Sequence, residues 1–155
     1  MTQPVVLDET IEVTASLPDA FSYLAEFAQI EQWDPGVARA RQLSAGAPGV
    51  GTEFEIVMKA GFSLFYRIVD FQRNRRILMA VDSRWFTAQE EILFESTPSG
   101  SRIRYVARFN FPLVLRLLNR LAPSVMDRVG KSAMAGLKRA LSGPAEETAG
   151  AAGAG

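Results

Sequence analysis

The sequence SVMDRVGKSAMAGLKRAL, residues 124–141, is the longest amphipathic stretch of the chain and decides its fold. Its apolar side chains recur three or four positions apart, which is the spacing of one face of an α-helix roughly 27 Å long at about 1.5 Å per residue. The apolar positions are Met126, Val129, Ala133, Leu137 and Leu141. Charged side chains occupy the opposite face, which should face water. The apolar face therefore needs a large apolar partner, and the sequence upstream predicts a sheet that can supply it.

That upstream sequence predicts seven strands in an antiparallel sheet. The strands cover residues 10–16, 37–43, 52–59, 62–71, 76–83, 86–96 and 102–111. Apolar and polar residues alternate most clearly in the last strand, so one of its faces is buried. Short turns join the last six strands, which is typical of antiparallel neighbours. Two short helices follow the first strand; Pro18 opens the first of them, and Trp33-Asp34-Pro35-Gly36 ends the second.

Length and composition exclude several classes of protein. At 155 residues the chain has the length of one domain. It contains no cysteine and no histidine, which excludes disulfides, thiol chemistry, histidine-based triads and histidine-ligated zinc. Any catalysis must use carboxylates, Tyr, Lys, Arg or bound water. No apolar run approaches the roughly 20 residues of a membrane span, and no signal peptide is recognisable, so we expect a cytoplasmic protein.

Charge is balanced overall but unevenly placed along the chain. Residues 1–60 hold nine acids and three bases, whereas residues 101–140 hold nine bases and a single acid. A net charge of zero argues against nucleic-acid binding, which needs a dominant positive field. Two interpretations stay open: the acidic and basic segments face one another across the fold, or the basic segment attracts an anionic ligand or makes transient contact with an anionic membrane surface.

The folded domain is expected to cover residues 9–142. Residues 1–8 precede the first alternating pattern and are interpreted as a loose leader. Residues 143–155 are rich in Ala and Gly and have no apolar period, which predicts a disordered tail.

The order of the predicted elements resembles that of the START/Bet v 1-like (SRPBCC) superfamily, most closely its polyketide cyclase/dehydrase and lipid-transport branch. Local features agree in the same order: Leu17-Pro18-Asp19, Trp33-Asp34-Pro35-Gly36-Val37, Gly49-Val50-Gly51, Pro98-Ser99-Gly100 and Leu137-Lys138-Arg139-Ala140-Leu141. The resemblance spans about residues 9–142. It implies an α+β helix-grip fold, in which a curved seven-stranded antiparallel sheet surrounds the long C-terminal helix.

The resemblance also implies an apolar cavity between sheet and helix. Members of the superfamily bind lipids, sterols, polyketides, plant hormones or quinones there, and some are aromatase/cyclases. We therefore expect a hydrophobic small-molecule ligand, with no metal and no covalent cofactor. Two alternatives stay open, namely a polyketide cyclase or dehydratase that uses polar pocket side chains, and a protein-interaction module of the co-chaperone or toxin type.

Apolar and aromatic residues at inward-facing positions are the candidates for ligand contact. They are Trp33, Phe54, Ile56, Tyr66, Phe94, Tyr105, Phe109, Met126 and Met134. The two methionines slightly favour a binding surface, because methionine adapts to irregular partners. The alternative is that these side chains simply fill a solid core.

Tyr66, Tyr105 and Asp70 are the polar candidates for catalysis or ligand orientation. A buried tyrosine needs a partner for its hydroxyl group, and either a ligand oxygen or a backbone carbonyl would serve. Asp70 shares strand parity with Tyr66, which would place it in the cavity as an acid or a base. Alternatively it lies at the strand end and pairs with Arg73 or Arg75.

The adjacent carboxylates Glu90 and Glu91 fall within one predicted strand. Successive side chains of a strand point to opposite faces, so these two cannot act together as an acid/base dyad. We assign Glu91, together with Arg67, to the exterior of the sheet.

The segment 111–121, just before the long helix, is rich in leucine and carries two arginines. One interpretation is a helix packed into the core. The other is a mobile lid at the cavity mouth, whose leucines touch lipid while its arginines meet head groups. The lid interpretation rests on Leu113, Arg116, Leu117 and Arg120.

Overall fold

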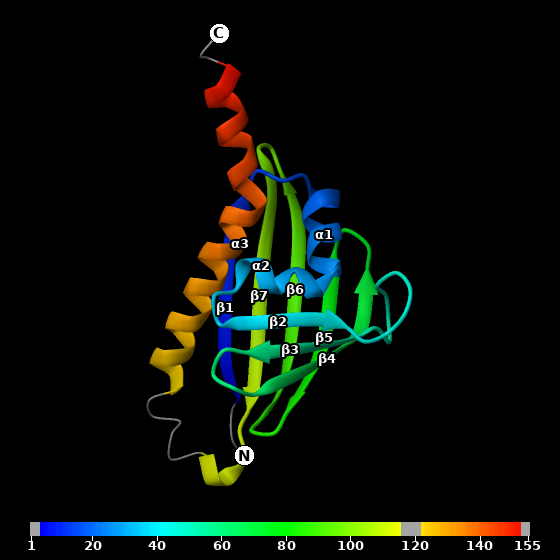
Figure 1. Ribbon diagram of the computed structural model, residues 1–155, viewed down its shortest axis with the longest axis vertical. Helices are drawn as coiled ribbons and strands as arrows, with labels where there is room; N and C mark the ends of the chain where they lie inside the picture. The colour runs from blue at the N-terminus through cyan, green and yellow to red at the C-terminus, as the bar shows by residue number, and fades with distance from the viewer. Residues whose placement is uncertain (1–3, 116–121, 153–155) are drawn as a thin grey trace.

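The computed structural model describes residues 4–115 and 122–152 and has the α+β architecture that the sequence predicts. Seven antiparallel strands form one curved sheet, and helix α3 runs along it (Figure 1). The elements are β1 (Val5–Val13), α1 (Leu17–Ala25), η1 (Phe27–Gln29), α2 (Ile30–Trp33), β2 (Val37–Gln42), β3 (Glu53–Met58), β4 (Ser63–Gln72), β5 (Arg76–Ser83), β6 (Thr87–Thr97), β7 (Gly100–Asn110) and α3 (Ala122–Ala152).

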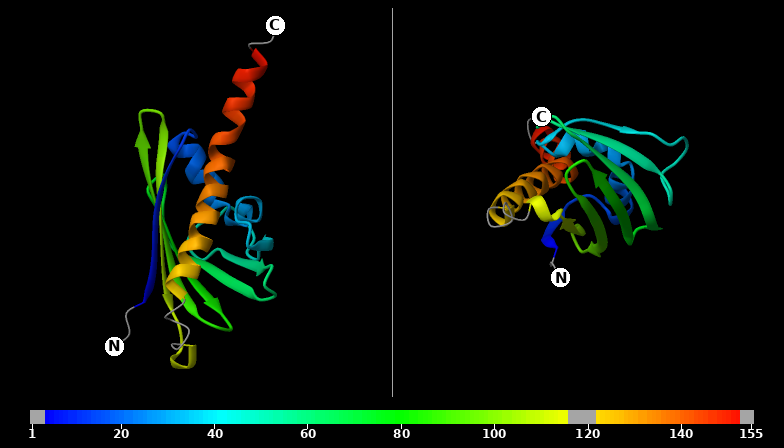
Figure 2. Two further views of the ribbon diagram at one scale, coloured as in Figure 1. Left: turned by 90° about the vertical axis from the view of Figure 1, so that its left-hand side faces the viewer. Right: turned by 90° about the horizontal axis from the view of Figure 1, so that it is seen from below.

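The strand order is β1-β7-β6-β5-β4-β3-β2. From β2 to β7, each strand pairs with the next one in the chain, as short antiparallel connections require. Strand β1 instead joins the sheet beside β7. Figure 2 shows that the sheet curls, with α3 and the short helices on its concave side. The prediction of a helix-grip fold is confirmed.

Strand β1 begins at Val5, five residues earlier than the sequence predicted. The loose leader predicted for residues 1–8 is therefore wrong from Val5 onward, and residues 1–3 lie outside the described residues. The physical reason is the partner strand: β1 pairs with β7 along its length, from Val5 opposite Phe109 to Val13 opposite Ser101.

Ion pairs on the outer face of this strand pair join the acidic start of the chain to its basic end. Arg104 approaches Asp8 at 2.6 Å, and Arg102 approaches Glu12 at 2.7 Å. These pairs support the interpretation that the acidic and basic segments face one another. They are largely exposed, so each contributes at most about 1 kcal/mol to stability.

Helix α1 begins where the sequence placed its start. The Ser16 hydroxyl oxygen accepts a hydrogen bond from the Asp19 N–H at 3.3 Å, and Pro18 lies in the first turn. The buried face of the helix fills part of the concave side with aromatic rings. The ring of Phe21 lies 5.2 Å from that of Phe71 and 5.1 Å from that of Phe94.

Helix α3 is held mainly through the middle of its length. Among the side chains of α3 that the structure describes, residues 124–143, the buried ones are Ala133, Met134, Leu137 and Leu141. A Cβ atom on Gly136 would lie 1.8 Å from the carbonyl oxygen of Trp33, so the close approach of α3 to α2 requires glycine here. The Leu141 carbonyl also accepts a hydrogen bond from the Ala15 N–H at 3.1 Å, which ties the helix to the end of β1.

Helix α3 continues to Ala152, beyond Leu141, where its apolar period ends. The structure thus differs from the disordered tail predicted from Gly143. Four alanines and two glutamates in residues 143–152 favour a helix, whereas Pro144 and two glycines oppose one. Among the described residues, no helix combines the length and hydropathy needed to cross a membrane.

Candidate functional site

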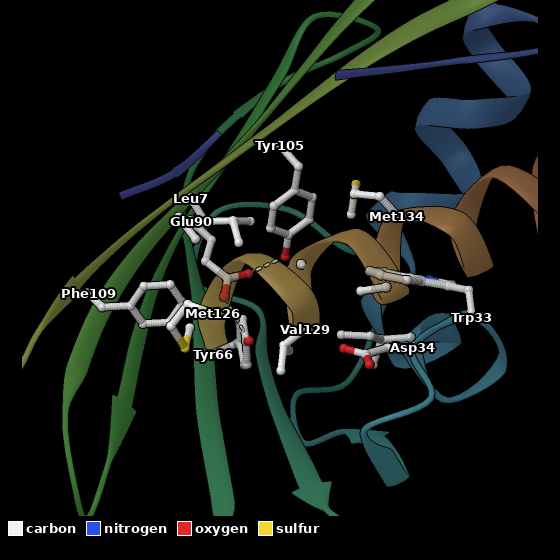
Figure 3. Close-up of a pocket in the computed structure, with 14 residues that line it drawn as sticks. Leu7, Trp33, Asp34, Tyr66, Glu90, Tyr105, Phe109, Met126, Val129 and Met134 are labelled. Atoms are coloured by element: carbon white, nitrogen blue, oxygen red, sulfur yellow. Dashed lines mark hydrogen bonds between the residues drawn. The ribbon is translucent and has the colours of Figure 1, made fainter. Parts of the chain in front are cut away.

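A cavity of about 80 Å³ lies between the concave face of the sheet and helix α3. Figure 3 shows side chains from both layers converging on it. Its lining residues are Leu7, Ile30, Trp33, Asp34, Tyr66, Glu90, Tyr105, Ala107, Phe109, Met126, Val129, Gly130, Ala133 and Met134. Most are apolar or aromatic, so the wall is hydrophobic with a few polar groups, as in small-molecule sites.

The cavity is smaller than a site for the lipid, sterol or polyketide ligands that the resemblance implies. Sites for drug-sized ligands usually enclose about 300 Å³ or more. The difference arises because large side chains of the sheet and α2, such as Trp33, Tyr105 and Phe109, project into the space beneath α3. The two layers therefore leave a gap, but in this structure it holds only a small group.

A buried carboxylate held by two tyrosines forms the polar end of the cavity. Glu90, on β6, is 6% exposed. The Tyr66 hydroxyl donates to its Oε1 at 3.0 Å, and the Tyr105 hydroxyl donates to its Oε2. Figure 3 shows this group near Phe109, away from Trp33 and Asp34 at the other end of the cavity.

Strand register explains why these three side chains meet. Glu90 lies opposite Ala107 on β7, and Tyr105 is two residues from that position on the same face. Tyr66 belongs to β4, two strands away from β6, and its long side chain reaches across the concave face over β5. The curvature of the sheet brings the two hydroxyl groups to the same carboxylate.

Burial dominates the electrostatics of Glu90. It raises the pKa of this carboxyl from 4.5 to about 7, although the hydrogen bonds from Tyr105 and Tyr66 oppose the shift. The charge of Asp34 acts in the same direction as burial. Burial next to Glu90 also raises the pKa of both tyrosines well above the ordinary value, so their hydroxyl groups keep their protons.

Asp34, just after α2, is the second carboxylate of the cavity. Its Oδ1 accepts a hydrogen bond from the Gly36 N–H at 2.8 Å. Burial raises the pKa of Asp34, while that hydrogen bond and the charge of Lys59 oppose the rise. No lysine or arginine of the described residues lines the cavity, so both carboxylates lack a cationic partner there.

Six of the nine predicted ligand contacts line the cavity: Trp33, Tyr66, Tyr105, Phe109, Met126 and Met134. The other three, Phe54, Ile56 and Phe94, are buried in the core outside it. Phe54 lies 5.9 Å from Phe27, ring to ring, and Phe94 packs against Phe21. A residue's parity in a strand indicates whether it is buried, but not whether a neighbouring helix covers it. Ligand contact by the six stays a prediction.

Asp70 does not enter the cavity. The register of β4 against β5 shifts between Ile68 and Asp70, so the parity inferred from Tyr66 fails beyond Ile68. The side chain of Asp70 is 34% exposed and pairs with Arg76 at 2.5 Å. Asp70 therefore forms an ion pair near the strand end, as the alternative interpretation expected, but its partner is Arg76 instead of Arg73 or Arg75.

Glu90 is the functional candidate that the sequence analysis missed. Glu90 and Glu91 do point to opposite faces, and Glu91 is exterior and bonded to Arg76 at 2.6 Å. The sequence could also have shown that Glu90 points inward, because it shares its strand parity with Ala88, Ile92 and Phe94, which are all buried. A charged residue in an otherwise apolar set was the available signal.

The lid residues fall mostly outside the described residues. Arg116, Leu117 and Arg120 belong to the segment 116–121, of which the structure describes nothing. Leu113 is described, and it is 71% exposed in a short 3-10 turn after β7. Core packing does not extend to Leu113, and the function of the segment stays a prediction.

The chain offers little for a metal ion. It has no histidine or cysteine, and the described residues contain no group of three or more acidic side chains arranged to hold one. The ionisable side chains that line the cavity are Glu90, Asp34, Tyr66 and Tyr105.

Known structures share this fold at low sequence identity. A START superfamily protein from Mycobacterium smegmatis is 14% identical, with a TM-score of 0.66 over 82% of this chain and 92% of that chain. A protein from Chromobacterium violaceum is 13% identical, with a TM-score of 0.69 over 88% and 96%. The di-domain ARO/CYC StfQ from the steffimycin biosynthetic pathway is 16% identical, with a TM-score of 0.69 over 96% of this chain and 52% of that chain.

Comparison of the sequence with family models identifies the family of the chain. No functionally curated protein matches it significantly. A family model described as polyketide cyclase / dehydrase and lipid transport matches residues 4–142, which is most of the chain. On this match, the chain belongs to the polyketide cyclase/dehydrase and lipid transport family.

Proposed function

We propose that the protein binds a hydrophobic small molecule between the sheet and helix α3. The observation that carries this proposal is the cavity itself, in which an apolar and aromatic wall surrounds one buried polar group formed by Tyr66, Glu90 and Tyr105. A ligand would exchange water for this wall at roughly 25 cal/mol per Å² of apolar area buried. The description of the family supports a ligand of the lipid or polyketide class, and sterols and quinones belong to the panel as further hydrophobic candidates.

The first turns of α3 are the part of the cavity wall that is most easily displaced. Val125 is 56% exposed and Val129 is 46% exposed, although Val129 lines the cavity. Farther along, Ala133 and Leu137 are buried, and Leu141 is bonded to Ala15. Because the beginning of the helix buries little, displacing it costs less than displacing its middle, and displacement enlarges the cavity.

Tryptophan fluorescence tests ligand entry. The chain has two tryptophans, Trp33 in the cavity wall and Trp85, which is exposed. In a Trp85→Phe background only Trp33 reports, so a bound apolar ligand shifts its emission. We expect saturable changes with members of a panel of fatty acids, fatty amines, sterols, quinones and aromatic polyketides.

Two matched variants on α3 establish where the ligand binds. Ala133→Phe places a ring in the cavity and is expected to abolish the emission change. Ala135→Phe adds the same ring to an exposed position of the same helix and is expected to leave binding unchanged. Circular dichroism checks that both variants fold. A panel that produces no saturable change in the Trp85→Phe protein contradicts the proposal.

A second candidate function, acid–base catalysis by a polyketide cyclase or dehydratase, is favoured by Glu90. With its pKa near 7, this carboxyl can accept and return protons at neutral pH, and two tyrosine hydroxyls stand beside it. The test is turnover of a poly-β-ketone by the wild type and by Glu90→Gln, with Glu91→Gln on the outer face as control. Loss confined to Glu90→Gln supports an enzyme, whereas no turnover by the wild type argues against it.

A further inference from the structure

We propose that the ligand presents a protonated amine to the polar end of the cavity, at Glu90, and that the cavity discriminates against carboxylates. The inference rests on the proposed function, because it names the class of ligand for the same site. It is drawn from the charges, the hydrogen-bonding capacity and the aromatic faces of the cavity wall.

Every ionisable side chain of the wall is an acid. Strand β6 contributes Glu90, the residue after α2 contributes Asp34, and β4 and β7 contribute Tyr66 and Tyr105. The residues from β1 and α3 are uncharged, namely Leu7, Met126, Val129, Gly130, Ala133 and Met134. An ionised Glu90 therefore places a negative charge in the cavity that no cation of the wall balances.

Near Glu90 the wall is also rich in hydrogen-bond acceptors and poor in free donors, whereas the indole N–H of Trp33 is a donor at the other end of the cavity. A carboxylate has about four lone-pair sites, and the two tyrosines use one on each oxygen of Glu90. Those bonds also occupy both hydroxyl hydrogens. Asp34 accepts one hydrogen bond, from the Gly36 N–H. A ligand that brings donors can satisfy the remaining sites, whereas a ligand that brings only acceptors cannot.

Aromatic rings complete a site for an organic cation. Trp33, Tyr66, Tyr105 and Phe109 border the cavity, and aromatic faces attract ammonium groups electrostatically. An amine near Glu90 would form a charge-assisted hydrogen bond in a buried setting, the strongest kind. A carboxylate placed there would face the charge of Glu90 and pay its own desolvation without a partner.

A matched six-carbon series tests the inference, because its members differ only in the head group. Hexylamine, hexanol and hexanoate are titrated into the protein at pH 8 and followed by amide chemical shifts in NMR spectra. We expect hexylamine to bind roughly tenfold or more tightly than hexanol, and hexanoate to bind most weakly. For hexylamine, which stays protonated throughout, affinity should rise from pH 6 to pH 8 as Glu90 ionises.

The matched variants are Glu90→Gln and Glu91→Gln. The two substitutions remove the same charge from neighbouring residues of β6, but only Glu90 faces the cavity. Glu90→Gln is expected to lose the preference for the amine and its pH dependence while still binding hexanol, which also shows that the variant is folded. Glu91→Gln is expected to keep both.

The outcomes separate this inference from the proposed function. Equal affinity for the three compounds, or an amine preference that survives in Glu90→Gln, overturns the inference and leaves hydrophobic binding standing. If neither this series nor the fluorescence panel shows binding, the proposed function itself fails, and the inference fails with it.

Discussion

Glu90 is the residue on which the chemistry of the molecule depends. It is a carboxyl group buried in the concave face, and the two hydroxyls that hold it do not compensate fully for its lost hydration. The chain has no histidine, so no other side chain with an ordinary pKa titrates between pH 5 and pH 8. Burial also raises the pKa of Asp34, so the part of the pH-dependent stability that Glu90→Gln removes is the measurement of Glu90.

Folding stability should fall as the pH rises from 5 to 8. The pKa of Glu90 is about 7 in the folded protein and near 4.5 when exposed, so the folded state binds more protons between these values. The contribution of the protonated group is complete below the lower value and is lost as the pH rises through the higher one. The expected loss in the free energy of unfolding is roughly 2 to 3 kcal/mol, measured by urea denaturation.

The variant Glu90→Gln supplies the control for that prediction. Because glutamine cannot ionise, the free energy of unfolding of Glu90→Gln should change clearly less than that of the wild type over the same range of pH. A wild-type protein whose stability is flat or rises between pH 5 and pH 8 would contradict the assignment of a buried carboxyl with a raised pKa.

The tyrosine hydroxyls should determine how far the pKa of Glu90 rises. Each donates a hydrogen bond to the ionised carboxylate, which lowers that pKa. Tyr66→Phe and Tyr105→Phe are therefore each expected to move the midpoint of the pH-dependent stability to higher pH. Tyr23→Phe, at the third tyrosine of the chain and outside the cavity, should leave the midpoint in place. A midpoint that stays fixed in both cavity variants would show that the hydroxyls do not stabilise the charge.

At the scale of single elements, strand parity predicted burial well up to the points where the register changes. Tyr66 and Tyr105 face inward as their parity indicated. Asp70 does not, because the irregularity after Ile68 lies between it and Tyr66. Such an irregularity depends on how two strands pair, and the alternation within one strand does not reveal it. Glu90 shows the opposite case, in which parity was informative but the charge obscured it.

Helix α3 offers a prediction about its glycines. In Gly136→Ala the new methyl group would meet the carbonyl oxygen of Trp33 at 1.8 Å, which forces the helix away from α2. We expect a loss of about 1 to 3 kcal/mol in the free energy of unfolding, as for overpacked cores. Gly143→Ala is the matched control, since nothing lies within 4 Å of its added atom, and the higher helix propensity of alanine should leave stability unchanged or raise it by up to about 1 kcal/mol. Equal stability of the two variants would contradict the close approach of α3 to α2.

At the scale of the whole molecule, the order of the elements, together with its resemblance to the START/Bet v 1-like superfamily, was enough to predict the fold. Six consecutive strands joined by short turns can form a meander, and an amphipathic helix at the end needs its concave face as a partner. The size of the cavity could not be predicted in this way. It depends on how far side chains such as Trp33 and Phe109 project beneath α3, which is a matter of rotamers and sheet curvature. Three of the nine predicted contacts lie outside the cavity because strand parity selects only a face of the sheet, and α3 covers only part of that face.

Native mass spectrometry of the gently purified protein shows whether an apolar molecule occupies the space between the sheet and α3, with Ala133→Phe as the filled-cavity comparison. We expect the wild type, loaded with the panel member that most changes Trp33 emission, to carry the added mass of that molecule and to release it on collisional activation. Ala133→Phe should carry none. A bare wild-type mass under the same loading, or an equal adduct on both proteins, would contradict binding in this space.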